Sequence, residues 1–377
     1  MASSNIKRAS LRHRLGEIIA DARSMSDADI GNVELLNLVV EEGVQGLIWQ
    51  KMTVVSDLNI NHDMKEALAA RLHEMNLRYL RMQHACGRIL ATLHQSNIQV
   101  ICMRGVAVTE MLYAEKAALR PISDIDLLID ERQMLDAKQA LWDIGFRPDS
   151  QYSNIYARGD IPIDLHHEPL GIERIRTWEH LTPLRIDDFL KYAQKGELVG
   201  EESLLLHPRV HLPYLCFHAL KHSFERLIWL YDIALLANEV DQSDQWDEIL
   251  AGIQEYKLER PCFYALSYVK EHLGAQVSDH VLEIIRPKMG FVERSLFRRF
   301  MKHEIIPFLA ERLFARMQPD FSHRLHFWRE TIYPRYEVRK QMVQSGCVKC
   351  NFIRKRLKQL IKAAWLFVKE GVSLIKV

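Results

Sequence analysis

Three aspartates carry the clearest chemical pattern in this sequence. Asp124 and Asp126 lie within ISDIDLLI, and Asp164 lies within IPIDLH. Side chains alternate faces along a strand, so Asp124 and Asp126 would point to one side while the residues beside them point into the core. Two carboxylates on one apolar strand repel each other unless a cation lies between them. Because hard oxygen ligands favour Mg²⁺ or Mn²⁺, we predict a divalent-metal site formed by Asp124, Asp126 and Asp164.

Two neighbouring features help to decide between a metal site and a solvated strand end. A strand-like run stops at Arg104-Gly105, which places a glycine turn upstream of the aspartate pair. Asp164 shows the same pattern of one acid among apolar residues. An isolated D-x-D pair is ordinarily solvated, but the glycine turn before it and the third acid after it favour metal binding.

The elements that would position these residues alternate in type. Apolar β-prone runs, glycine turns and a proline breaker indicate the order strand, helix, strand, helix, strand and strand. The expected elements are 98–103, 106–115, 122–129, 131–143, 152–157 and 161–166. This order predicts a small α+β unit around a mixed sheet.

Long stretches on both sides of this unit have helical patterns. Residues 64–95 contain no proline and form one apolar stripe at steps of four and three, and residues 210–240 are apolar on one side of a long helix. The predicted class is α+β, with a small mixed-sheet core, a helical N-terminal region and an all-helical C-terminal domain. The expected parts are residues 1–95, 96–200 and 201–345, and a basic amphipathic C-terminal helix at 346–377.

Composition and charge restrict the partners and the compartment. The chain has 50 Lys and Arg against 49 Asp and Glu, so net charge gives no reason to expect a nucleic-acid partner. No run approaches the roughly 20 apolar residues of a transmembrane helix, and the polar N-terminus lacks the apolar core of a signal peptide. The six cysteines show no disulfide spacing, and the lone C-x-x-C at Cys347 and Cys350 lacks a second pair for zinc. We expect a cytoplasmic protein.

The C-terminal segment 350–377 has the pattern of a cationic amphipathic helix. Its Lys and Arg residues lie among apolar residues at helical spacing. Such a helix could attach peripherally to an anionic inner membrane surface or bind an anionic partner. The alternative is a terminal helix that docks on the protein with its charged face in solvent.

The ordered set of motifs resembles the DNA polymerase β-like nucleotidyltransferase superfamily, in which a strand, a glycine turn and a helix precede a D-x-D strand and a later strand with one Asp. More narrowly, it is similar to a family of uncharacterised bacterial nucleotidyltransferases with R-x-x-x-D-I-D-L-L and I-D-x-H strands. A later helix of that family carries H-x-x-x-H and R-L-x-W-L-x-D-I. The matching segments are 103–105, 120–128, 163–166, 218–222 and 226–233, within about residues 35–240.

The resemblance implies that a nucleoside monophosphate moves from a nucleoside triphosphate, with ATP as the expected donor, to a hydroxyl acceptor. Asp124 and Asp126 would hold a Mg²⁺ or Mn²⁺ ion that bridges the triphosphate, and Asp164 would help to hold a second ion near the acceptor hydroxyl. Pyrophosphate would leave. The acceptor could be a small molecule, a peptide or a protein side chain.

Residues near the glycine turn are implied to contact the nucleotide. Gly105 would let the backbone approach the triphosphate, Arg120 would meet a phosphate oxygen, and Ser123 could donate a hydroxyl. Arg104 stands where the narrower family has Lys and supplies positive charge with a different geometry. Val106 follows Gly105 where the superfamily has serine, so the serine contact to phosphate is missing.

Histidines and one arginine complete the candidate nucleotide-binding set. His166 shares the face of Asp164 and could orient it. His218, His222 and Arg226 recur at helical spacing along one face of the expected long helix. They could contact the base or the acceptor, or position Asp164. The alternative is an internal hydrogen-bond network that pins this helix to the sheet.

Two other functions stay open. A binding or regulatory protein with a degenerate transferase fold would explain the missing serine, although all three acids are present. A different metal-dependent phosphotransfer enzyme, such as a hydrolase or a kinase, would release orthophosphate or a nucleoside diphosphate in place of pyrophosphate.

Overall fold

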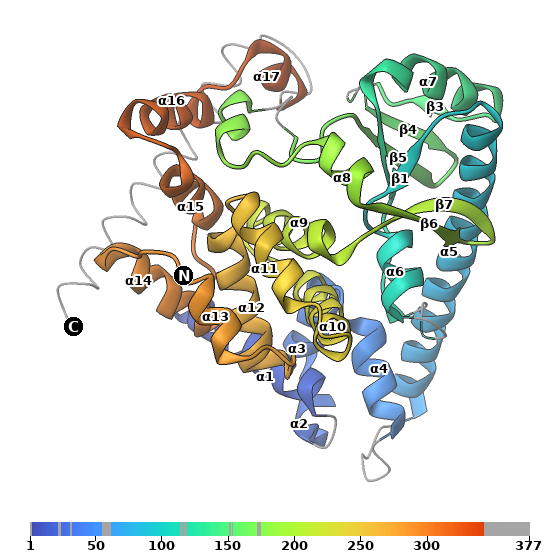
Figure 1. Cartoon of the computed structure of the whole chain (residues 1–377). Helices are drawn as coiled ribbons and strands as arrows, with labels where there is room; N and C mark the ends of the chain where they lie inside the picture. The colour runs from blue at the N-terminus through green and yellow to red at the C-terminus, as the bar shows by residue number, and fades with distance from the viewer. Residues whose placement is uncertain are drawn as a thin grey trace. The chain divides into compact units, whose positions relative to one another are not determined.

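Two compact units make up the chain. The computed structural model describes residues 2–21, 24–30, 32–54, 62–113, 116, 119–150, 152, 154–171 and 175–342. One unit contains the described residues within 2–170 and 182–306, and the other contains those within 171–181 and 307–342. Figure 1 labels helices of both units and strands of the first.

The first unit contains a seven-stranded mixed sheet in the order β3-β4-β5-β2-β1-β7-β6. Its strands are β1 (Val100–Cys102), β2 (Ile125–Ile129), β3 (Arg147–Pro148), β4 (Ile155–Arg158), β5 (Ile161–His166), β6 (Ala193–Leu198) and β7 (Glu201–Leu206). β2 is antiparallel to β1 and parallel to β5, and β7 is parallel to β1. The predicted α+β class with a mixed sheet is confirmed, and each of the four predicted strands is present.

The hairpin β6–β7 is an element that the sequence pattern does not indicate. β6 reads AQKGEL and β7 reads EESLLL, so charged residues stand where an alternating strand would need apolar ones. β7 joins the sheet by pairing in parallel with β1, where Ile101 lies opposite Leu204. Tertiary pairing, more than local β-propensity, therefore holds this hairpin in the sheet.

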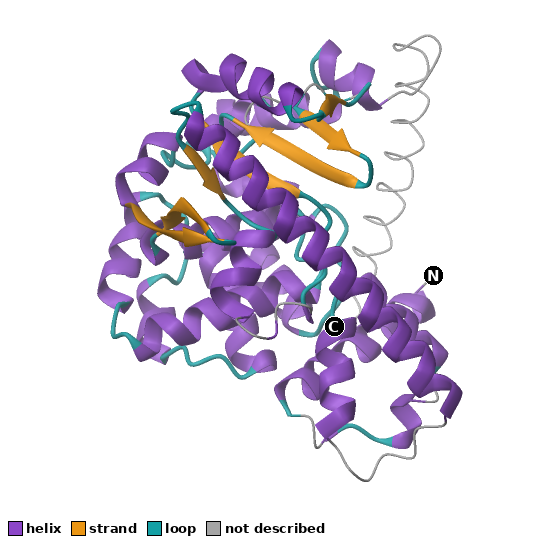
Figure 2. Ribbon diagram, turned by 90° about the vertical axis from the view of Figure 1, so that its right-hand side faces the viewer, coloured by secondary structure: helices purple, strands orange, loops and turns teal. Residues whose placement is uncertain are grey.

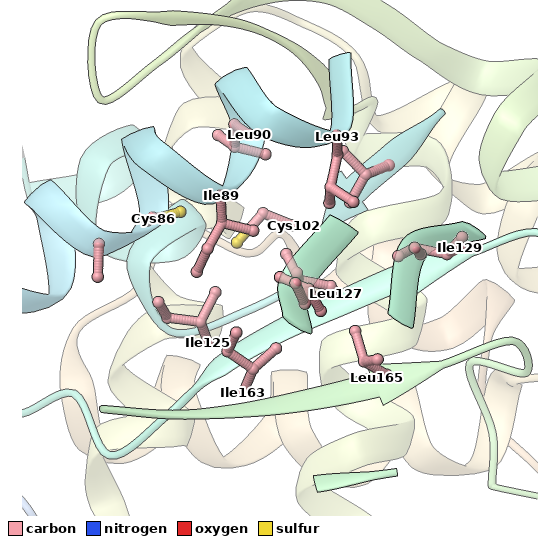
Figure 3. Close-up of a cluster of buried hydrophobic side chains, with 14 of the residues drawn as sticks. Cys86, Ile89, Leu90, Leu93, Cys102, Ile125, Leu127, Ile129, Ile163 and Leu165 are labelled. Atoms are coloured by element: carbon pink, nitrogen blue, oxygen red, sulfur yellow. The ribbon is translucent and has the colours of Figure 1, made fainter. Parts of the chain in front are cut away.

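Helix α5 (His62–Gln95) crosses one face of the sheet and is the long helix that the apolar stripe predicts (Figure 2). Its C-terminal half packs on alternate residues of the strands, and α7 (Met134–Asp143) packs beside it. The cluster in Figure 3 includes Cys86, Ile89, Leu90, Leu93, Cys102, Ile125, Leu127, Ile129, Ile163 and Leu165. Because side chains alternate along a strand, Asp126 and Asp164 must project from the opposite face of the sheet.

Helices of the first unit precede, interrupt and follow the sheet in sequence. Besides α5, α7 and the 3₁₀ turn Glu131–Gln133, they are α1 (Ala2–Ala20), α2 (Asp27–Ile30), α3 (Val33–Glu41), α4 (Gln45–Val54), α6 (Val106–Tyr113), α8 (Ile186–Tyr192), α9 (Pro208–Lys221), α10 (Leu227–Gln242), α11 (Trp246–Glu255), α12 (Glu259–Leu273), α13 (Asp279–Ile284) and α14 (Phe291–Met301).

The prediction of one helix over residues 210–240 is wrong, because α9 and α10 are separated by residues 222–226. Ser223 and Phe224 both have a φ of +54°, a left-handed conformation that ends a helix. Phe224 is fully buried and stacks at 6.4 Å on the ring of Tyr264. The turn therefore places an aromatic side chain in the core, which the apolar periodicity of the segment does not reveal.

The second unit is helical over its described residues. It contains a 3₁₀ helix (Arg176–His180), α15 (Leu309–Met317), α16 (Phe321–Ile332) and α17 (Tyr336–Met342). The ring of Trp178 meets that of Phe314 edge to face at 5.6 Å, and the backbone N–H groups of residues 176 and 177 donate to the Glu330 carboxylate at 3.0 and 2.9 Å.

The predicted basic helix at 346–377, with its expected membrane contact through 350–377, lies outside the described residues. Among the helices that the structure does describe, none is long and apolar enough to cross a membrane.

Candidate active site

Strands β2 and β5 bring two of the predicted aspartates together. The strands are parallel neighbours, and their register places Asp126 opposite Asp164. Both project from the sheet face opposite α5, because the apolar residues on either side of each aspartate fill the core under that helix. The expectation that the third acid lies on a strand next to the D-x-D strand is confirmed.

His166 forms a group of three candidate metal ligands with these aspartates. Its Nε2 atom lies 3.4 Å from an oxygen of Asp126 and 3.2 Å from an oxygen of Asp164. One ligand atom from each residue lies within 4.8 Å of the other two. Burial opposes the charged form of His166, but hydrogen bonds to Asp126 and Asp164 outweigh burial and raise its pKa to about 9.

Arg104 supplies positive charge to Asp126 in a buried position. It lies in the turn between β1 and α6, and its guanidinium donates to the Asp126 carboxylate. Burial alone would raise the pKa of Asp126, but Arg104 and His166 outweigh burial and hold it below its usual value. Arg104 also contacts the ring of His218. Burial and the charge of Arg104 lower the pKa of His218, so this ring is neutral and accepts from the guanidinium.

Asp124 lies in the loop just before β2, at the edge of the same acidic group. Ser123 donates its hydroxyl to the Asp124 carboxylate at 2.6 Å. Burial and the nearby charge of Asp126 raise the pKa of Asp124, and Asp164 contributes in the same direction. Asp124 is therefore electrically coupled to both strand aspartates, although it does not belong to the three-ligand group of Asp126, Asp164 and His166.

The chemistry of this donor set fits a hard divalent cation. Carboxylate oxygens from Asp124, Asp126 and Asp164 suit Mg²⁺ or Mn²⁺, whereas Nε2 of His166 faces Asp126 and Asp164 as a hydrogen-bond donor. Asp126 already has the Arg104 guanidinium as a direct partner. An ion at Asp126 would therefore compete with Arg104 for the same carboxylate.

Gly105 is required by the geometry of its own turn. It has a φ of +56°, and a Cβ atom added at this position would lie 2.8 Å from the backbone oxygen of Asp124. The turn after β1 thus approaches the loop before β2 too closely for any side chain. This contact places Arg104 and Asp124 next to each other. The predicted approach of a triphosphate to Gly105 remains a prediction.

Gly105→Ala should destabilise the first unit by about 3 kcal/mol, since a strained φ and a backbone clash add together. Gly159→Ala is the matched control, because Gly159 has a φ of +62° but no atom within 4 Å of its added Cβ. The control should lose only about 1 kcal/mol. Urea unfolding of both variants measures the difference. Equal losses of unfolding free energy in the two variants would show that the backbone of Asp124 moves away from the added Cβ at no energetic cost. The turn would then not be closely packed.

Arg120 lies in a buried ion pair. Its Nε and Nη2 atoms donate to the Asp232 carboxylate at 2.9 and 2.8 Å, and its Nη1 atom lies 3.4 Å from the Gly105 carbonyl oxygen. Tyr113 donates its hydroxyl to the same carboxylate at 2.8 Å. All three guanidinium nitrogens therefore have protein acceptors. This arrangement favours a role in holding the glycine turn, and a contact of Arg120 with phosphate stays a prediction.

The helix break divides the predicted polar face between two helices. His218 lies in the last turn of α9, His222 caps the end of that helix, and Arg226 precedes α10. The rings of His218 and His222 have centroids 4.8 Å apart, and Trp229 lies 5.3 and 5.1 Å from them. The Arg226 guanidinium is 5.7 Å from the Trp229 ring centroid. These residues are neighbours, and His218 contacts Arg104.

Two further residues of α9 reach the same region and were missed by sequence reasoning. His211 donates from Nε2 to the backbone oxygen of Met103 at 3.2 Å, and burial lowers its pKa to about 4. Tyr214 is buried beside Arg104, and burial raises its pKa to about 12. Positions 211, 214 and 218 follow helical spacing, so the periodicity that indicated His218 could also have indicated these two.

Two polar side chains from outside α9 hold the acidic loop and strand. Asn154 donates its amide to the carboxylate of Asp164. Arg78 of α5 donates to the backbone oxygens of Ile122 and Ser123 at 2.8 and 2.7 Å, which fixes the loop that carries Asp124. No local pattern marks either residue, and Arg78 acts across more than 40 residues of sequence.

Comparison with known proteins gives one match to a family and one to a solved structure. Residues 28–274 match a family described as uncharacterised nucleotidyltransferases. A crystal structure of an antigenic nucleotidyltransferase-like protein from Paracoccidioides brasiliensis is similar at 17% identity and a TM-score of 0.33, over 53% of this chain and 95% of that one. No curated protein matches significantly.

Proposed function

This chain belongs to the family of uncharacterised nucleotidyltransferases, and from that premise we propose that it catalyses metal-dependent transfer of a nucleoside monophosphate from a nucleoside triphosphate, with ATP as the expected donor, to a hydroxyl acceptor. Pyrophosphate is the second product. The acceptor is a small molecule, a peptide or a protein side chain. The motif order supports placing the family in the DNA polymerase β-like superfamily.

One observation carries this proposal. Asp126 and Asp164 stand in register on two adjacent parallel strands, with Asp124 beside them in the loop before β2. The two strand carboxylates thus project from one face of the sheet with Asp124 electrically coupled to them, and a nucleotidyltransferase needs such an acidic group to bind divalent cations.

Asp124, Asp126 and Asp164 would hold the metal. When bound, a Mg²⁺ or Mn²⁺ ion there would neutralise triphosphate charge and lower the pKa of the acceptor hydroxyl. Arg104 donates to the carboxylate of Asp126, and it would exchange this contact for one with a phosphate oxygen. The N-terminal end of α6 directly follows Gly105 and favours a bound anion.

The proposed transfer forms one bond at the α-phosphorus, breaks another and moves one proton. A bond forms between the acceptor oxygen and the α-phosphorus, and the bond from that phosphorus to the bridging oxygen breaks. The acceptor proton moves to the Asp164 carboxylate or to water, and pyrophosphate leaves with the electron pair of the broken bond. His166 donates to both strand aspartates and would keep Asp164 oriented for this step.

The test is to incubate the protein with nucleoside triphosphate labelled at the α- or the γ-phosphorus and to separate the products. We expect label from the γ position in pyrophosphate and label from the α position in a nucleoside monophosphate or its acceptor adduct. EDTA should abolish both, and Mg²⁺ or Mn²⁺ should restore them. Orthophosphate or a nucleoside diphosphate as the product would instead identify a different phosphotransfer enzyme.

A binding or regulatory protein is the second candidate, and the direct pairing of Arg104 with Asp126 favours it. The missing serine after Gly105 points the same way. In that case nucleotide binding would be weak, independent of divalent cations and not followed by turnover. Equilibrium binding of a non-hydrolysable triphosphate with Mn²⁺ and with EDTA distinguishes the two candidates.

A further inference from the structure

Three histidines from distant parts of the chain meet in the first unit, away from the aspartates. His13 lies on α1, His272 lies near the end of α12, and His303 follows α14. One ring nitrogen from each lies within 4.8 Å of those of the other two. The ring centroid of His303 is 4.9 Å from that of His13 and 4.2 Å from that of His272.

We propose that His13, His272 and His303 form a second metal site, which binds one transition-metal ion of the Zn²⁺ type. Imidazole nitrogens are preferred ligands of Zn²⁺, whereas Mg²⁺ prefers the carboxylates on the sheet. The site does not depend on the proposed nucleotidyl transfer. Its ion would join the N-terminal helix α1 to the end of α12 and to the chain after α14.

Hydrogen bonds to one nitrogen of two of the rings leave the other nitrogen of each for an ion. Nε2 of His272 donates to the backbone oxygen of Met301 at 2.9 Å, which leaves Nδ1 of His272 as the unprotonated nitrogen. Nδ1 of His303 lies 2.7 Å from the hydroxyl of buried Tyr268, so Nε2 is its second nitrogen. Metal-bound histidines typically have their other nitrogen fixed in this way by a carbonyl or another protein group.

The distance between the facing nitrogens of His13 and His303 suits tetrahedral coordination. Nδ1 of His13 and Nε2 of His303 lie 3.0 Å apart, where one proton is shared between them. Two nitrogens bound to one tetrahedral Zn²⁺ lie about 3.3 Å apart, given Zn–N bonds near 2.0–2.1 Å. An ion could therefore replace the shared proton with a small movement of the rings.

The exposure of the rings also favours an ion. His303 is 3% exposed, whereas the side chain of His13 is 54% exposed. An ion could thus enter from the solvent past His13, and water could take the fourth position. Glu17 lies 3.6 Å from Nε2 of His13 but already accepts from Arg14 at 2.8 Å.

The test uses full-length protein without a polyhistidine tag, freed of metal by a chelator and titrated with Zn²⁺ against a chromophoric competitor. We expect His13→Ala to bind Zn²⁺ at least about 10-fold more weakly than wild type, because one of three ligands is lost. His280→Ala is the matched control, since His280 is an exposed histidine on α13 and should change nothing. Zn²⁺ should raise the thermal midpoint of wild type and of the control but not of His13→Ala.

A double variant, Asp126→Asn with Asp164→Asn, separates this site from the acidic group. It should still bind one Zn²⁺ with the affinity of wild type. Zn²⁺ binding that is unchanged in His13→Ala, or that is lost only in the aspartate variant, would overturn the proposal. The three histidines would then be a hydrogen-bonded contact between helices. Circular dichroism of metal-free His13→Ala shows that the comparison is made on folded protein.

Discussion

Asp126→Asn is expected to lower the rate of pyrophosphate release at least about 10³-fold. Asparagine keeps the shape of the side chain and an oxygen that can accept from Arg104, but it removes the charge in register with Asp164. A neutral oxygen is a poorer ligand for a hard cation, so Mn²⁺-dependent nucleotide affinity should fall together with the rate. Initial rates at saturating nucleotide and equilibrium binding with Mn²⁺ measure the two effects.

Two variants make this result interpretable. Asp143→Asn changes an exposed acid at the end of α7 and should leave both quantities at the wild-type level. Asp164→Asn changes the partially exposed partner on β5 and should lose activity without unfolding. If Asp126→Asn and Asp143→Asn are both folded and equally active, the β2–β5 carboxylates do not hold a catalytic ion, and the binding or regulatory alternative gains support.

Local sequence pattern predicts the centre of the sheet well. β1, β2, β4 and β5 are short runs rich in apolar residues and bounded by turn residues. Such runs predict strands from the local sequence alone. Asp126 and Asp164 stand out because each interrupts such a run with a charge. The same alternation that buries the residues beside them forces both carboxylates onto the other face. The two carboxylates lie close together because β2 and β5 are adjacent in the sheet.

Features that depend on distant contacts could not be predicted in this way. The break between α9 and α10 exists because Phe224 is buried against Tyr264, and the hairpin β6–β7 exists because β7 pairs with β1. Asn154 donates one hydrogen bond to Asp164 from a turn that has no recognisable sequence motif. Such contacts are properties of the tertiary structure, and a single sequence carries no signal for them.

Arg120 has a different partner in the structure from the one that the resemblance implies. The resemblance implies that it meets a phosphate oxygen, but the structure pairs it with Asp232, which lies in another matching motif. Both side chains are almost fully buried, at 7% and 3% exposure. A buried guanidinium that leaves its carboxylate would leave that charge uncompensated, which costs several kcal/mol.

Arg120→Met and Asp232→Asn should therefore each destabilise the first unit by about 3–5 kcal/mol, because each leaves one buried charge without its partner. The double variant should lose less than the sum of the two single losses, since the buried pair is broken only once. Lys7→Met is the matched control. It breaks the ion pair of Lys7 with Glu34, in which both side chains are more than half exposed, and should cost at most about 1 kcal/mol. Denaturant unfolding of the four variants gives the coupling energy.

The activity of these variants decides between positioning and direct contact with the nucleotide. If Arg120 acts by holding the Gly105 turn, Arg120→Met and Asp232→Asn should lose similar activity per folded molecule, because both release the same turn. If Arg120 binds phosphate, Arg120→Met should weaken nucleotide binding by at least about 10-fold while Asp232→Asn leaves it near wild type. Additive losses of stability in the double variant would contradict the ion pair itself, whatever the activities are.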